Sequence, residues 1–278
     1  MNKHTYLSLF FLIIFSVSIS SQDNTIEEVI VTATKTEKTL QEVPVAVSVV
    51  TSDVIEKATI LDTFDLKSVI PSLDSRQYQS STNATFFIRG FGNGSNNPGV
   101  EPSVALFVDG VYRSKTQSQI SDLPMLERIE VLRGPQSTLF GKNASAGVIN
   151  IVTKKPSFEE STMISAGIGK YNSRVGKIYT TGPLSDTTAY SFNANFNKRD
   201  GHSDNPVTGN SVNNRDRFGI RAELLFVPAD DLSIRVTADY DEYDEICCAV
   251  GSTSYGTANV VTALFGGQII PNLSLIHI

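Results

Sequence analysis

The chain has few of the residues that build metal centres and nucleophilic catalytic sites. It contains two cysteines and three histidines in 278 residues, and none of them follows zinc-ligand spacing. No serine stands in a nucleophile elbow. The two cysteines are the neighbours Cys247 and Cys248, which seldom bridge each other because the backbone would be strained. They carry no assigned chemistry, and we expect no enzyme activity, no metal site and no cofactor.

Long apolar runs are missing beyond the N-terminus, and long basic runs are missing throughout. A transmembrane helix needs about 20 apolar residues, so none is expected after the first 20 positions. A membrane β-barrel is not excluded, because its alternating strands average out in hydropathy. The formal net charge of −6 argues against a general nucleic-acid-binding protein.

The N-terminus reads as a signal for export. Lys3 supplies a positive charge, Leu7–Ile19 is a short apolar run, and Ser18 and Ser20 are the small residues of a cleavage site. The alternative is a membrane anchor, but the run is too short to cross about 30 Å of hydrocarbon. We therefore predict that residues 1–20 are a cleaved signal peptide.

Two regions follow the signal. Residues 21–42 contain EEVIVTATK at 27–35, where Val29, Ile30 and Val31 form a small β-prone stretch between polar residues. An ordinary first strand is the alternative reading of that stretch. Residues 43–156 alternate short apolar strands with short capped helices, which predicts an α+β domain. Its strands are expected at 45–50, 86–88, 104–108, 129–132 and 148–152, and its helices at 52–57, 63–70 and 121–126.

After Pro156 the pattern changes to strict alternation of apolar and polar residues. Strands are expected at 162–168, 174–180, 190–196, 217–226 and 234–240. The best of them are about 10 residues long, with tight turns at 182–186 and 228–231 and longer polar loops between the others, as in an outer-membrane barrel. A soluble sandwich with one wet face is the alternative. Five strands leave open edges, so residues 157–278 are predicted to be the start of an incomplete antiparallel transmembrane β-barrel in a longer protein.

Other motifs carry weaker chemistry. Residues 134–142 suggest a phosphate loop, but six residues separate Gly134 from Gly141, where four are needed, and Asn143 replaces the Mg²⁺-binding Ser or Thr. The acidic residues of 239–245 are read as a solvated loop rim, with calcium binding as the alternative. Gly90, Gly134, Gly141 and Gly147 are interpreted as turn positions that need a permissive backbone.

Together these segments resemble TonB-dependent outer-membrane receptors. EEVIVTATK at 27–35 is similar to that family's TonB box. FIRGFG at 87–92, VALFVDGVY at 104–112 and RIEVLRGPQSTLFGKNASAGVINIVTKKP at 128–156 resemble its plug domain. The resemblance implies energised nutrient import through a monomer in the lipid of the Gram-negative outer membrane, with the TonB protein adding a β-strand to the box.

The resemblance also implies site residues. The box positions expected to bind TonB are Glu28, Val29, Ile30, Val31, Thr32 and Ala33. Ligand contacts are expected on the plug apices at Arg76, Tyr78, Gln79, Phe91, Tyr112, Arg113 and Lys115. Arg89, Glu130 and Arg133 are expected to contact the polar barrel lumen, where Arg217, Arg221, Glu223 and Arg235 are candidate partners.

The ligand class stays open at this point. Basic apical residues suit an anionic iron chelate such as a ferric siderophore, while cobalamin, a carbohydrate or another nutrient is the alternative. A signalling receptor is less favoured, because only a few residues separate the signal from Glu27. A passive porin or adhesin would lack both the box and the plug.

Overall fold

The computed structural model describes most of the chain beyond its N-terminal region. The described residues are 29–32, 34–77, 84–92, 99–114, 122, 125–204, 209–246 and 264. The predicted signal peptide and the pair Cys247-Cys248 therefore lie outside the described residues. Within the described part of the chain, no helix is long and apolar enough to cross a membrane.

A mixed five-stranded sheet is the centre of the N-terminal half. Its order is β3-β9-β10-β7-β8, in which β10 and β7 are parallel and the other neighbours antiparallel. The strands are β3 (Val47–Thr51), β7 (Val104–Val108), β8 (Val111–Tyr112), β9 (Leu126–Arg133) and β10 (Gly147–Thr153). All five predicted strands of this region are therefore present, four in this sheet and one, β5 (Ala84–Ile88), in a separate sheet between β4 (Leu73–Gln77) and β6 (Phe91–Gly92).

Short helices join these strands. α2 (Ser52–Lys57) has the predicted bounds, and its Asp53 and Lys57 form an i,i+4 ion pair at 2.9 Å. η2 (Asp65–Ser68) is a single 3-10 turn within the predicted helix 63–70, and α3 (Ser137–Phe140) follows β9. The predicted helix at 121–126 is wrong. Asp122 forms an isolated antiparallel bridge to Asp62, and Leu126 already belongs to β9.

The central sheet buries both faces, because β9 alternates between two apolar clusters. Ile129 and Val131 belong to the larger cluster, which also contains Phe64, Leu66, Phe86 and Ile88. Leu132 belongs to the smaller cluster with Val31, Phe107, Phe140 and Val148. Continuous burial of this kind explains why β7 reads as an unbroken apolar run rather than as an alternating strand.

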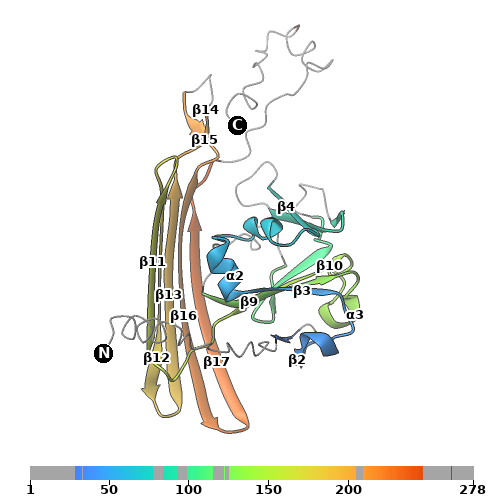
Figure 1. The fold of residues 1–278 in the computed structure, drawn as a ribbon, viewed down its shortest axis with the longest axis vertical. Coiled ribbons are helices and arrows are strands. Elements are labelled where there is room, and N and C mark those ends of the chain that lie inside the picture. The colour runs from blue at the N-terminus through green and yellow to red at the C-terminus, as the bar shows by residue number, and fades with distance from the viewer. Residues whose placement is uncertain are drawn as a thin grey trace, which may run out of the picture.

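The second half is an antiparallel sheet of long strands that stands beside the first half (Figure 1). Its order, β11-β12-β13-β16-β17, follows the sequence. The strands are β11 (Ser161–Gly169), β12 (Ser173–Ser185), β13 (Thr188–Arg199), β16 (Arg215–Ala229) and β17 (Leu232–Tyr243), with the short β14 (Ser203–Asp204) and β15 (Ser211–Val212) in the long loop. We call these five long strands the wall.

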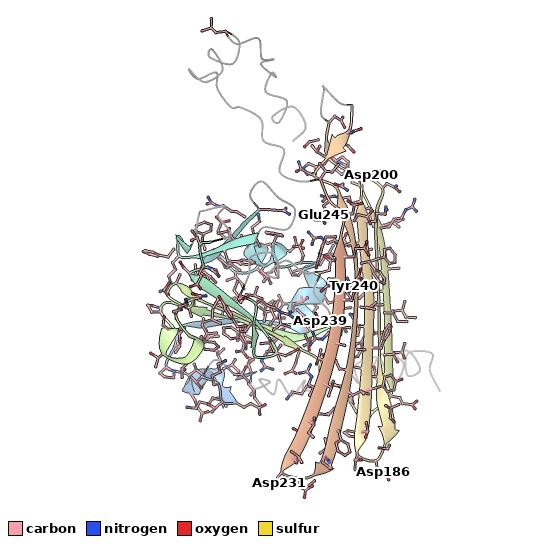
Figure 2. The ribbon with its side chains drawn as sticks, turned by 180° about the vertical axis from the view of Figure 1, so that it is seen from behind. Asp186, Asp200, Asp231, Asp239, Tyr240 and Glu245 are labelled. Atoms are coloured by element: carbon pink, nitrogen blue, oxygen red, sulfur yellow. The ribbon has the colours of Figure 1, made fainter. Side chains whose placement is uncertain are left out.

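The tight turns marked by Asp186 and Asp231 lie at one end of the wall, the tight-turn end, and Asp200 and Glu245 lie at the other, the long-loop end (Figure 2). The short turn between β11 and β12 also lies at the long-loop end, where the Asp200 N–H donates to the Tyr171 carbonyl at 2.8 Å. Because β12 continues to Ser185 and β16 to Ala229, the turns are tighter than the sequence predicted. β4 lies toward the long-loop end and β2 (Lys38–Thr39) toward the tight-turn end (Figure 1).

The wall reverses the usual arrangement of polar and apolar faces. On β13, Asn193, Asn195 and Asn197 are buried, whereas Phe192 and Phe196 are 39% and 49% exposed. The neighbouring β16 does the same, with buried charged residues alternating with exposed apolar ones. A soluble sandwich would bury the aromatic face. An apolar outer face and a polar inner face are what a strand in a lipid-facing barrel requires, and the sheet is the open start of such a barrel.

Candidate functional site

A strap of the chain, described at residues 29–32 and 34–40, is docked against the N-terminal domain. Within it β1 (Ile30–Val31) pairs antiparallel with β2, Ile30 opposite Thr39 and Val31 opposite Lys38. Val31 is fully buried in the smaller apolar cluster, while Ile30 remains 51% exposed. Burying a valine side chain contributes about 1.5–3 kcal/mol, so this residue anchors the strap.

A buried carboxylate holds the next residue of the strap. Glu130 on β9 is fully buried and accepts hydrogen bonds from the Thr32 backbone N–H at 2.8 Å and from the Thr32 hydroxyl at 3.1 Å. Arg128 Nε donates to the same carboxylate at 2.8 Å, and Asn150 Nδ2 at 3.2 Å. A buried charge is tolerated because donors surround it on all sides, and the strap supplies two of those donors.

The strap is fixed again three residues later. The Lys35 ammonium lies 4.6 Å from the centroid of the Phe107 ring and 4.4 Å from that of Phe140, which are cation–π distances. Val31, Thr32 and Lys35 therefore contact the same side of the sheet. The structure describes four of the six predicted box residues, and Glu28 and Ala33 lie outside the described residues.

The sequence predicted that Glu130 contacts the wall. Among the described residues, its hydrogen-bond partners are instead Thr32, Arg128 and Asn150, because β9 directs the side chain toward the strap. Among the described residues, neither Arg89 nor Arg133 forms an ion pair. Arg89 is exposed and Arg133 is half-buried.

Most of the ion pairs between the domain and the wall are made by aspartates of the domain. Arg217 on β16 is 1% exposed at its side chain and its Nη1 lies 2.9 Å from both Asp62 Oδ2 and Asp122 Oδ1. Glu245, which lies near the long-loop end (Figure 2), also binds Arg217 and pairs with Arg215 at 3.0 Å. Two carboxylates of the domain thus meet one buried guanidinium of the wall.

A second cluster of charges lies at the turn between β7 and β8. Asp109 in that turn binds Arg221 and Arg235 of the wall, the latter at 3.3 Å. Glu223 lies between the same two arginines, 2.6 Å from Arg221 and 2.8 Å from Arg235. All four wall residues named from the sequence therefore belong to these clusters, although their plug partners are Asp62, Asp109 and Asp122.

The acidic stretch near the end of β17 also pairs with arginines. Asp239 (Figure 2) lies 3.7 Å from Arg113 and 3.5 Å from Arg221, and Glu245 binds Arg215 and Arg217. Within the part of the chain that the structure describes, no group of three or more His, Cys, Asp or Glu side chains is arranged to hold a metal ion. The calcium alternative for this stretch therefore has no support from the described residues.

The predicted ligand contacts fall into two groups. Arg76 and Phe91 lie on the sheet β4-β5-β6, where Phe91 is 73% exposed and Arg76 packs over the Phe87 ring. Tyr112 instead packs 5.3 Å from the Phe107 ring, beside the cluster that holds Val31, and its hydroxyl accepts from Asn143 at 2.6 Å. Arg113 pairs with the wall. The positions Tyr78, Gln79 and Lys115 lie outside the described residues.

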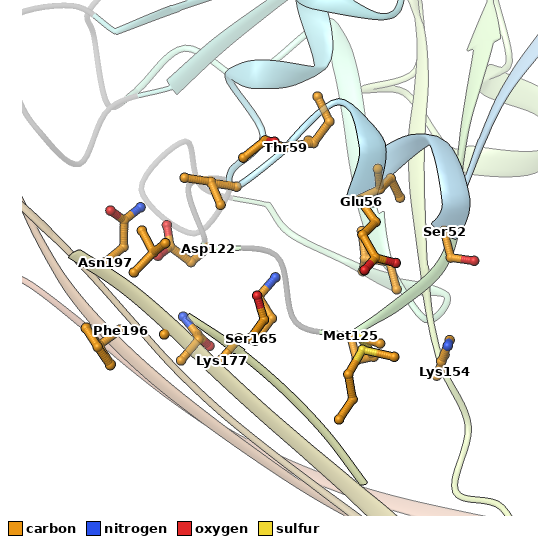
Figure 3. A pocket seen from close by; sticks show the side chains of 18 of the residues that line it. Ser52, Glu56, Thr59, Asp122, Met125, Lys154, Ser165, Lys177, Phe196 and Asn197 are labelled. Atoms are coloured by element: carbon orange, nitrogen blue, oxygen red, sulfur yellow. The ribbon is translucent and has the colours of Figure 1, made fainter. Parts of the chain in front are cut away.

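A cavity of about 310 Å³ separates α2 from the wall (Figure 3). Ser52 and Glu56 line it from α2, and Ser165, Lys177 and Asn197 line it from β11, β12 and β13. Asp122 also borders the cavity, and burial raises the pKa of its carboxyl against the lowering effect of Arg217. Apolar side chains such as Ile60, Met163 and Phe196 line the rest of the cavity, so the interface between the domain and the wall combines ion clusters with a cavity of mixed polarity.

The comparisons with known proteins agree with this geometry. Residues 39–148 match the family model described as TonB-dependent Receptor Plug Domain. The crystal structure of the ferric yersiniabactin uptake receptor FyuA from Yersinia pestis aligns with a TM-score of 0.66 and 28% identity, over 71% of this chain and 31% of that chain. Residues 39–148 therefore carry the plug domain of TonB-dependent receptors.

Two curated proteins are also similar to the chain by sequence. The pesticin receptor of Yersinia pestis is 32% identical over 181 residues, which is 65% of this chain and 26% of that protein. The vitamin B12 transporter BtuB of Vibrio vulnificus is 26% identical over 245 residues, or 83% of this chain and 37% of that protein. The chain thus spans about a quarter to a third of the length of these relatives, with its matches in the plug and the first barrel strands.

Proposed function

We propose that the protein is an outer-membrane receptor that imports a scarce nutrient with energy supplied by TonB. The observation that carries the proposal is the strap, a β-prone segment docked against the plug, close to the tight-turn end of the wall (Figure 1). In barrels of this kind the tight turns face the periplasm. An extended peptide at that end is available to a periplasmic partner that binds by strand addition.

The proposed ligand is an iron chelate. The ferric yersiniabactin uptake receptor is similar to this chain at 28% identity. On the sheet β4-β5-β6, Arg76 and Phe91 are exposed, and Arg76, which pairs with Asp74 at 2.6 Å, can exchange that carboxylate for an anionic ligand. Arginine favours anionic oxygen groups of the kind that such chelates carry. The likeness to a vitamin B12 transporter supports a cobalamin as the second candidate.

The proline variant Ile30→Pro of the full-length receptor tests energised import. Proline removes a main-chain donor from the box, so we expect energised uptake to fall to background while ligand binding to the cell surface is retained. Ile30→Ala keeps the main-chain donor and is the matched control, which should transport close to the wild-type rate. If Ile30→Pro cells still accumulate ligand in an energy-dependent way, the proposal is wrong.

Competition separates the two ligand candidates. Cells that carry the full-length gene are given radioactive ferric chelate with an excess of unlabelled cobalamin, and the reverse. Inhibition of iron uptake by other ferric chelates but not by cobalamin supports the iron assignment. Saturable cobalamin uptake without iron uptake would support the second candidate instead.

A further inference from the structure

The docked strap already makes main-chain hydrogen bonds to its surroundings. β2 pairs with one edge of β1, where the Leu40 N–H donates to the Val29 carbonyl at 2.9 Å, and the Thr32 N–H is donated to Glu130 at 2.8 Å. A partner that binds by strand addition uses main-chain hydrogen bonds, so it meets a segment that the plug already holds.

Glu130 differs from the other anchors of the strap because it is charged and fully buried. Val31 contributes apolar contact and Lys35 a surface cation–π contact, both without strict geometry. The carboxylate instead binds the N–H and the hydroxyl of Thr32 together, with Asn150 Nδ2 within 3.2 Å of the same hydroxyl. Hydrogen bonds to a charged acceptor are the stronger class.

Arg128 and Asn150 keep this carboxylate hydrogen-bonded when the strap leaves. Both donate to Glu130 from within the plug, Arg128 Nε at 2.8 Å and Asn150 Nδ2 at 3.2 Å. When Thr32 leaves, the Arg128 guanidinium still neutralises the buried carboxylate, and both residues still donate hydrogen bonds to it. Release of the strap therefore leaves no unpaired buried charge, which would cost stability. The plug can remain folded after the strap undocks.

We propose that Glu130 is the catch of the strap: its hydrogen bonds to Thr32 set how often the box is exposed to its periplasmic partner. The inference rests on the proposed function, since it assigns regulation to the same box. It makes Glu130 a positioning residue that acts on the strap and has no contact with the transported ligand.

The test measures exposure of the strap without any transport. In the full-length receptor, Val31→Cys places a thiol at a buried strap position, in a background free of other cysteines. The rate of reaction with a maleimide is measured in outer-membrane fragments that lack TonB. Glu130→Ala should raise the labelling rate about tenfold, and Thr32→Val, which removes only the hydroxyl contacts, about threefold.

Glu127→Ala is the matched control. Glu127 is a carboxylate on the same strand that also pairs with Arg128, but it has no contact with the strap among the described residues. It should leave the labelling rate unchanged. Retained binding of ferric chelate by each variant shows that the plug is assembled. Because Thr32→Val keeps the buried carboxylate paired, the labelling rate of this variant tests the proposal even if Glu130→Ala does not assemble.

The outcomes separate the catch from the proposed function. Faster labelling in Thr32→Val and Glu130→Ala, with Glu127→Ala unchanged, supports the catch. Labelling of Thr32→Val at the starting rate overturns it, as does an equal increase in Glu127→Ala. Labelling needs neither TonB nor uptake. The proposal for Glu130 can therefore be supported when the Ile30→Pro experiment contradicts energised import, and it can be contradicted when that experiment supports energised import.

Discussion

At the scale of single residues, burial determines what each carboxylate does. Glu130 is fully buried and satisfied by donors from both the plug and the strap. Asp65 is also largely enclosed, where it accepts the backbone N–H of Leu61 at 2.9 Å. Burial, and next the neighbouring Asp62, raise the pKa of Asp65 above its ordinary value of 3.8. The same chemical group thus serves as a catch in one place and as a turn acceptor in another.

The raised pKa of Asp65 predicts a pH dependence. The folded plug holds the proton of Asp65 more tightly than the unfolded chain does, so the stability contributed by this group falls as pH rises from 3.8 through the raised value. Asp65→Asn keeps an oxygen acceptor and removes the titration. The stability of the variant relative to wild type should therefore increase with pH across that window.

Hydrogen exchange of plug amides in the full-length protein measures this difference at each pH. Ser68→Ala, on the same turn, changes no ionisable group and is the control. A difference between Asp65→Asn and wild type that stays constant with pH would contradict the prediction.

At the scale of elements, the close contact between β9 and β10 depends on Gly147. All four glycines interpreted as turn positions have positive φ, and Gly147, at +157°, starts β10 rather than lying inside a turn. A Cβ at this position would lie 2.4 Å from the Leu132 carbonyl oxygen and 2.6 Å from Ile88 Cδ1. The backbone oxygen cannot move without breaking the pairing of the two strands.

Gly147→Ala should therefore destabilise the plug by about 3 kcal/mol, the upper range for overpacking a core. Faster hydrogen exchange across β9 and β10, with the wall unchanged, is the expected signature. Ser145→Ala, an exposed position just before the strand, is the control and should exchange like wild type. Normal protection of β10 in Gly147→Ala would show that the sheet can relax around the added methyl group.

At the scale of the whole molecule, two ion clusters join the plug to the wall. Arg217 binds Asp62 and Asp122, and Asp109 binds Arg221 and Arg235. Removing one partner of a buried ion pair leaves an uncompensated charge and costs about 3–5 kcal/mol. A substitution at either cluster therefore leaves buried charge without a partner at the contact between the plug and the first strands of the barrel.

Arg217→Ala should lower the thermal stability of the full-length receptor by about that amount, because three carboxylates lose their shared partner. The plug should separate from the wall first, which limited proteolysis of the plug detects. Arg174→Ala, at an exposed position on β12, is the control and should leave the melting temperature unchanged. Equal melting temperatures for both variants would mean that the cluster contributes no net stability.

The sequence by itself determined most of the long strands and their order. Alternation at residues 190–240 predicted wall strands and which of their faces is polar, and the β-prone stretch at 29–31 contains the strand β1, whereas β4 and α3 were not predicted. Such patterns are local, since side chains in a strand alternate with a period of two. The helix predicted at 121–126 failed because Asp122 instead bridges Asp62, 60 positions away in the chain, a partner that no local pattern shows.

Only the tertiary structure decided which charges meet. Thr32 and Glu130 are 98 positions apart, and Arg217 and Asp62 are 155 apart. The sequence assigned Glu130 to the wall, since a buried charge needs a partner and the lumen offered several. Packing instead brought it against the strap, because β9 directs alternate residues to opposite faces and Glu130 lies on the face that the strap covers. The charge of a residue and its tendency to be buried are properties of its side chain, whereas its partner depends on how distant segments of the chain pack.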